Sequence, residues 1–118
     1  MSSIHYIVNV EAVIIREDQY LLIERGPEET HAAGLLSLVG GKVEDASIVD
    51  GILEATLRRE IREEVGIEVA EQMAYLESKS FIANGEVVVD VVFLCPHRSG
   101  DGIITDPGEV AAIHWLTA

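Results

Sequence analysis

Three glutamates stand at spacings that would gather their carboxylates if the chain is helical there. Glu60, Glu63 and Glu64 are three and four residues apart, and residues at these spacings share one face of an α-helix. Gly66 predicts the helix end directly after them, where the helix dipole is negative and carboxylates are unfavourable. A divalent cation would turn their repulsion into shared coordination. Oxygen ligands without paired His or nearby Cys favour Mg2+ or Mn2+ and therefore phosphate chemistry.

The alternative interpretation is a solvated acidic helix end, with Arg59 and Arg62 in surface ion pairs of little energetic weight. Under this interpretation the glutamates would bind nothing. The wider pattern around the cluster decides between the two.

The rest of the chain predicts a sheet that would position this helix. Apolar residues from Ile52 to Val65 recur at helical spacing, and strand patterns precede and follow them. Asn84-Gly85 between two β-rich runs is a strong hairpin signal. The predicted strands cover residues 4–15, 20–23, 35–39, 67–69, 75–83, 86–95 and 111–116. This order predicts a layered α/β domain with a mixed sheet.

Size, charge and cysteine content narrow the function. The 118 residues suit one domain, residues 1–118. A net charge of −13 repels a phosphate backbone and argues against a nucleic acid polymer as partner. The chain lacks the roughly 20 consecutive apolar residues of a membrane span, and its first residues do not form a secretory signal. Cys95, the single cysteine, also favours a reducing, cytoplasmic location.

At this point the sequence resembles a known family. Gly41 followed by the helix end is similar to the Nudix box of the Nudix hydrolases, or MutT-like domains, and residues 34–44 are similar to the stretch that enters that box. The resemblance covers about residues 4–116. It implies a Nudix-type α/β/α sandwich with a mixed β-sheet. The residues that carry it at the helix end are Arg59-Glu60-Ile61-Arg62-Glu63-Glu64-Val65-Gly66-Ile67.

The resemblance also implies a role for each matching residue. Glu60, Glu63 and Glu64 match the metal-binding and catalytic glutamates, and the Gly41 carbonyl matches a further metal ligand. Arg59 matches the arginine that orients these carboxylates, a role that suits its forked guanidinium. Family members differ in which glutamate is the base, so the three are assigned as a unit.

The sequence departs from the family pattern in the loop before the helix. Four extra residues separate Gly41 from Arg59, and Ser47 and Gly51 stand where the box has a glutamate. We expect another acid of this loop to hold Arg59. Asp50 is the first choice and Glu44 the second, with Asp45 a further alternative.

Two further departures concern the end of the chain and the strand before the box. Val39 replaces the proline common before the two glycines, and the chain stops soon after Trp115, where relatives continue into another helix. The C-terminal helix is therefore expected to be missing or truncated, with a homodimer covering the exposed sheet. Glu109 is the best candidate for an extra carboxylate near the metal, and His31 for a contact from the loop to the substrate.

These features predict a Mg-dependent pyrophosphohydrolase. It would cleave a phosphoric anhydride bond of a nucleoside diphosphate linked to another moiety, so that its partner is a small nucleotide-type molecule. The alternatives are a nucleotide-binding or sensing module that has lost turnover, because the box glutamate is absent, and an acidic protein-interaction domain. Metal-dependent product release from a nucleotide panel separates them.

Overall fold

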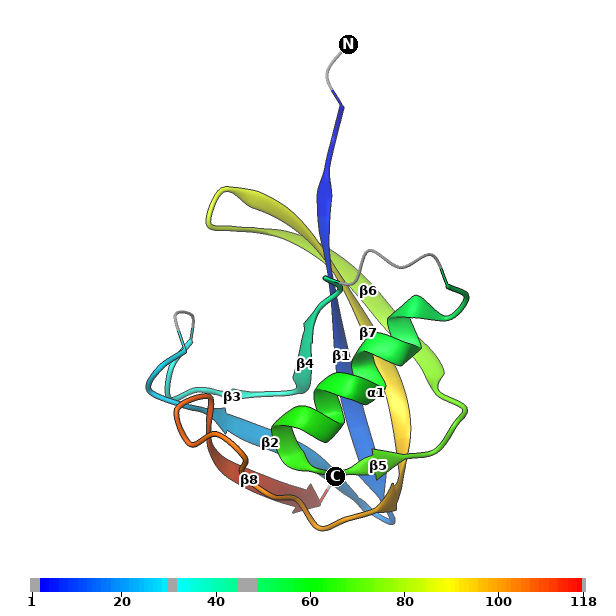
Figure 1. The fold of residues 1–118 in the computed structure, drawn as a ribbon, viewed down its shortest axis with the longest axis vertical. Coiled ribbons are helices and arrows are strands. Elements are labelled where there is room, and N and C mark those ends of the chain that lie inside the picture. Colours follow the sequence, from blue (N-terminus) through cyan, green and yellow to red (C-terminus); the bar gives the residue numbers. More distant parts are fainter. Residues whose placement is uncertain (1–2, 30–31, 45–48, 118) are drawn as a thin grey trace.

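The computed structural model describes residues 3–29, 32–44 and 49–117, and Figure 1 shows its course. Within these residues the chain forms eight strands and one helix. Their bounds in chain order are β1 (Tyr6–Arg16), β2 (Gln19–Arg25), β3 (Leu36–Ser37), β4 (Val39–Lys42), α1 (Ile52–Val65), β5 (Glu68–Val69), β6 (Ala74–Ala83), β7 (Glu86–Ser99) and β8 (Val110–Thr117).

The sheet is mixed, as the sequence predicts. Strand β1 lies parallel to β7, with Tyr6 opposite Val87 and Ile15 opposite Pro96. The same strand is antiparallel to β2 and β4. Strand β7 also pairs with β5 and β6, and β2 pairs with β3 and β8, all antiparallel. Because β1 joins both groups of strands, its side chains lie at the centre of the sheet.

The predicted β6–β7 hairpin is confirmed. Its turn consists of Asn84 at φ 52° and Gly85 at φ 78°, the positive φ values that a two-residue type I′ turn requires. The hairpin extends away from the helix at one end of the molecule (Figure 1).

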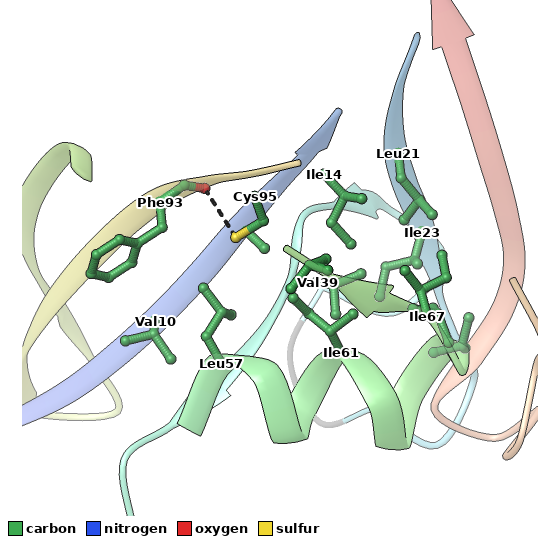
Figure 2. Close-up of a cluster of buried hydrophobic side chains, with 14 residues drawn as sticks. Val10, Ile14, Leu21, Ile23, Val39, Leu57, Ile61, Ile67, Phe93 and Cys95 are labelled. Carbon is green, nitrogen blue, oxygen red and sulfur yellow. Dashed lines mark hydrogen bonds between the residues drawn. The ribbon is translucent and has the colours of Figure 1, made fainter. Parts of the chain in front are cut away.

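Helix α1 begins and ends at the predicted residues and packs on the sheet through the predicted stripe. Its buried residues are Thr56, Leu57, Ile61 and Val65. Figure 2 shows Leu57 and Ile61 directed toward the strand side chains of Val10 and Val39. Burial of each such aliphatic side chain contributes about 1.5–3 kcal/mol. This packing fixes which face of α1, and which glutamates, lie against the sheet.

The C-terminal end of α1 is closed by glycine and by a distant loop. Gly66 adopts φ 64°, and its N–H donates to the Arg62 carbonyl at 3.0 Å. The Ile103 N–H donates to the Val65 carbonyl at 2.7 Å, and the Thr105 hydroxyl donates to the Glu63 carbonyl at 2.6 Å. Carbonyls that the helix leaves unpaired are thereby satisfied, and the loop after β7 is attached to the last turn of α1.

The two glycines before the helix lie inside a strand. Gly40 and Gly41 belong to β4 and pair with Glu11 and Val10 of β1. A Cβ at Gly40 would lie 2.0 Å from the Val10 carbonyl oxygen. Glycine is required here for close approach of two backbones and not for a turn.

One helical layer is present in the described residues. Helix α1 covers one side of the sheet (Figure 1), and it is too short and too polar to cross a membrane. Strand β6 leaves Tyr75, Leu76 and Ile82 exposed. The homodimer stays a prediction.

Candidate active site

Strand β4 receives two of the three predicted glutamates of α1. A Cβ at Gly41 would lie 2.7 Å from the Glu60 carboxyl carbon, so the Glu60 carboxylate occupies the space that a side chain would take. One turn later, the Gly40 N–H donates a hydrogen bond to the Glu64 carboxylate. The two glycines of β4 therefore give Glu60 and Glu64 access to the backbone of the sheet.

The environment of these two glutamates disfavours their negative charge. Burial is the largest cause of a raised pKa at Glu60, where Arg59 acts in the opposite direction and Glu63, Glu44 and Glu109 add repulsion. Repulsion among carboxylates therefore accompanies desolvation at this position.

Glu64 shows the same effect more strongly. Burial, followed by the charges of Glu60, Glu109 and Glu29, raises the pKa of Glu64 to about 8, against the lowering effect of the Gly40 hydrogen bond. Its Oε2 atom is buried and has no hydrogen-bond partner. A buried acceptor without a donor is costly, and a cation would satisfy it.

Arg59 has a different partner from the one the sequence predicted. Its guanidinium lies 3.5 Å from the Glu60 carboxylate, and in the described residues neither Asp50 nor Glu44 forms an ion pair with it. Asp50 precedes the helix, and Arg59 lies roughly 10 Å further along the axis, so a short side chain there does not reach it. Glu44 instead lies near enough to repel Glu60. Asp45 and Ser47 lie outside the described residues.

Among the acids after β7, one lies at the site and two have structural roles. Glu109 repels both Glu60 and Glu64, so the late loop does bring a further carboxylate to them. Asp106 accepts from the Gly108 N–H at 2.9 Å within its own turn, and Asp101 pairs with Arg16 at 3.0 Å. His31 lies outside the described residues.

The residues present fit a divalent cation, although the described residues do not hold a preassembled cage. Among residues 3–29, 32–44 and 49–117, no three His, Cys, Asp or Glu side chains are grouped closely enough to bind a metal ion. Glu63 is exposed and only flanks the Glu60–Glu64 pair. The unpartnered Glu64 oxygen and the acids around it suit Mg2+, which completes its shell with water and phosphate oxygens.

Two cavities beside the glutamates form what we call the groove. A cavity of about 250 Å³ includes Gly40, Gly41 and Glu64, and one of about 490 Å³ extends to Phe81 and Asn84 of the β6–β7 hairpin. Six residues line both cavities and make them contiguous: Asn9, Glu11, Arg25, Glu29, Ser37 and Lys42.

The sequence analysis missed two polar residues that line the groove, Asn9 and Glu11, and the buried acid that contacts them. Asp90 is 1% exposed, and its Oδ1 accepts from Asn9 Nδ2 at 2.7 Å. Burial, and then hydrogen bonding and repulsion from Asp90, raise the pKa of Glu11 to about 8. A protonated Glu11 can therefore donate a hydrogen bond to Asp90, whose buried Oδ2 has no partner among the described residues. The sequence did contain a signal, because Glu11 and Asp90 are each an acid inside a run of β-branched residues.

Arg25 was also missed and brings positive charge to the groove. Its guanidinium pairs with Glu29 at 2.8 Å, with both side chains about one quarter exposed. The separation of four residues is no helical signal in this loop, so the sequence alone did not connect them.

The fold is a mixed sheet with a helix whose glutamates lie against two glycines of a strand. Comparison with known proteins identifies this class of fold. The family model described as NUDIX domain matches residues 5–118. The chain belongs to the Nudix family.

Three similar proteins give the range of this resemblance. The chain is 29% identical over 106 residues to NAD-capped RNA hydrolase NudC of Vibrio vulnificus (strain CMCP6), covering 90% of this chain and 37% of that protein. It is 36% identical over 81 residues to CTP pyrophosphohydrolase of Escherichia coli (strain K12), covering 69% of this chain and 56% of that protein. The crystal structure of a MutT NUDIX hydrolase from Burkholderia pseudomallei superposes with a TM-score of 0.80 at 34% identity, covering 96% of this chain and 84% of that one. The chain thus spans under two thirds of the length of the two curated relatives.

Proposed function

We propose that this chain is a Mg-dependent pyrophosphohydrolase that cleaves a phosphoric anhydride bond of a nucleotide-type substrate. The observation that carries the proposal is Glu64, whose buried Oε2 has no partner. Glu64 lies one turn after Glu60 on α1, and both carboxylates lie against Gly40 and Gly41 of β4. The names of the two curated relatives, an NAD-capped RNA hydrolase and a CTP pyrophosphohydrolase, support a nucleotide-type substrate.

The chain offers a set of oxygen ligands for the metal. Glu60, Glu64 and the Gly41 carbonyl would hold the cation, with Glu63 at the margin, and Arg59 would restrain the Glu60 carboxylate. When bound, a divalent cation polarises phosphoryl oxygens and lowers the pKa of a water molecule. The Nudix family generally uses divalent metals such as Mg2+.

The other residues of the groove would orient the substrate and receive the proton. The forked guanidinium of Arg25 lines both cavities and suits phosphate oxygens. In the reaction, the oxygen of water bonds to phosphorus and the bond from phosphorus to the bridging oxygen breaks. A carboxylate of the unit formed by Glu60, Glu63 and Glu64 accepts the water proton, and Glu109 adds negative charge that keeps such a proton nearby.

The test is product analysis with and without Mg2+ across nucleoside triphosphates, dinucleoside polyphosphates, ADP-ribose, sugar nucleotides, NAD and NAD-capped RNA. We expect phosphate-containing products that depend on Mg2+ and are lost with EDTA. Glu54→Gln is the matched control, because Glu54 is in the first turn of the same helix, away from the cluster. Absence of turnover for the whole panel would overturn the proposal.

The sensing module has one observation in its favour. No acid of the described loop holds Arg59, and the box glutamate is replaced by Ser47 and Gly51. Metal-dependent nucleotide binding without turnover in the same panel would support that function instead. Absence of both binding and turnover would favour an acidic interaction domain.

A further inference from the structure

The groove also has a polar pair that is separate from the glutamates of α1, formed by Asn9 and Asp90. Asn9 lies on β1 between residues whose side chains alternate in direction. Val10 and Ala12 belong to the core, so Asn9 faces the opposite side of the sheet. Its parallel partner in the register is Asp90. Asn9 lines both cavities and is the point where the strand pair meets the groove.

The hydrogen bond between Asn9 and Asp90 fixes which atom of the amide is available. An ionised carboxylate only accepts hydrogen bonds, so the 2.7 Å contact requires the amide NH2 of Asn9 to face Asp90. The amide carbonyl Oδ1 is then directed elsewhere, as a fixed acceptor. Asp90 prevents the amide from rotating by 180°, which would exchange acceptor and donor.

A carboxylate at Asp90 is unusual if its role is only structural. The residue is 1% exposed in the run Val87-Val88-Val89-Asp90-Val91-Val92, where burial of a charge is costly. A threonine or valine would pair the strands without this cost. The structural alternative is a buried polar pair that joins β1 to β7 and touches no ligand.

The larger cavity has the shape and lining that suit a planar ring. Its volume of about 490 Å³ lies within the usual range for small-molecule sites. Ile7, Phe81 and Val88 supply apolar surface, and Asn9 lies in the same lining. A nucleobase matches both parts, because its faces stack on aromatic and apolar side chains while its edge carries hydrogen-bonding groups.

We propose that Asn9, held by Asp90, recognises the base of the substrate by accepting a hydrogen bond from an exocyclic amino group, with the ring against Phe81. This inference rests on the proposed function and names its substrate class: nucleotides of amino-bearing bases, with the phosphates toward Glu60 and Glu64. Asp90 acts through Asn9 and is a positioning residue.

Matched nucleotides that exchange an amino group for a carbonyl test the proposal. CMP and UMP form one pair, and AMP and IMP form the other. We expect the intact chain, titrated by NMR, to bind the amino-bearing member of each pair about tenfold more tightly, the effect of one hydrogen bond. Equal binding within each pair, or no binding of any of the four at millimolar concentration, would overturn the proposal.

Variants then assign the preference to the Asn9–Asp90 pair. Asp90→Asn keeps the shape but allows the Asn9 amide to rotate, so the preference should fall to about twofold or less. Asp18→Asn makes the same chemical change in an exposed turn and should preserve the preference. If Asp90→Asn does not fold, the comparison of matched nucleotides on the unmodified chain still decides.

Turnover separates failure of this inference from failure of the proposed function. With CTP and UTP, Asp90→Asn should raise KM for CTP while leaving kcat unchanged. Equal kcat/KM for CTP and UTP in the unmodified chain would remove base recognition but keep the hydrolase. Selective binding of CMP and AMP without turnover of any nucleotide would keep base recognition and remove the hydrolase.

Discussion

Two pairs of acidic side chains lie at the groove, and they differ in what compensates the burial of their carboxyl groups. Glu11 and Asp90 can share a proton, and Asp90 also accepts from Asn9 at 2.7 Å. Glu60 and Glu64 repel each other, and Glu64 keeps an oxygen without a partner. Each pair therefore keeps one buried oxygen without a partner, Oδ2 of Asp90 and Oε2 of Glu64. The first pair is nevertheless held by hydrogen bonds within the chain, whereas the second only repels and would need a cation from outside.

The largest expected effect comes from Glu64→Gln, which removes a charge from the pair that repels. We expect Mg2+ affinity and turnover to fall, with turnover reduced more than about 100-fold, since even residues that only support a metal ligand are worth 10–100-fold. Glu11→Gln, which alters the hydrogen-bonded pair, should leave Mg2+ affinity nearly unchanged. Full Mg-dependent hydrolysis by Glu64→Gln would show that this residue is not a metal ligand.

The same variant should increase the stability of the metal-free protein, depending on pH. The folded-state pKa of Glu64, about 8, exceeds the ordinary value of 4.5. The contribution of Glu64 is therefore fully present below pH 4.5 and is lost as the pH rises through 8. Urea unfolding in EDTA should show Glu64→Gln more stable by about 0.3–1 kcal/mol above pH 8, with the difference vanishing at low pH. Unfolding of the metal-free variant would instead make the glutamates structural.

Replacement of each glycine of β4 by alanine should separate an effect on activity from an effect on stability. A Cβ at Gly41 meets only the end of the Glu60 side chain, which can move aside, so Gly41→Ala should reduce activity about tenfold with under about 1 kcal/mol lost in stability. A Cβ at Gly40 meets the β1 backbone, so Gly40→Ala should cost about 1–3 kcal/mol or more. Kinetics and urea unfolding of both variants check this. Equal effects of the two substitutions on stability would contradict it.

The prediction furthest from the groove concerns Cys95, a buried ionisable group that lines neither cavity. Burial raises the pKa of its thiol to about 12, so roughly one molecule in ten thousand carries a thiolate at pH 8. Labelling by a thiol reagent should be about a thousandfold slower in the folded protein than in urea. Comparable rates in the two states would show that the β7 side of the core opens readily.

Local signals accounted for what the sequence could predict. The stripe from Ile52 to Val65 and the stop at Gly66 identified α1, and Asn84-Gly85 identified the hairpin. Both depend on neighbours within a few residues. Helical spacing and the resemblance to the Nudix box predicted a unit of three glutamates, of which Glu60 and Glu64 lie against β4 and Glu63 is exposed.

The rest of the site depends on contacts between distant residues. Asn9 and Asp90 are 81 residues apart and meet only because β1 and β7 are parallel neighbours, a register that no local pattern specifies. The partner of Arg59 also depends on the path of the loop before α1 in space, and the acidic residues in the loop sequence do not specify that path. The use of Gly40 for close backbone approach could not be predicted either, because it depends on the neighbouring strand β1.

The parallel pairing of β1 with β7 also has a consequence for how the chain folds. Helix α1 and the β6–β7 hairpin consist of contacts close in sequence, which form early. Strand β1 is made before the other strands of the sheet, yet its partner β7 reaches Pro96 in their shared register. Because closure of so long a loop is slow, we expect the groove to assemble late, after β7 has been synthesised.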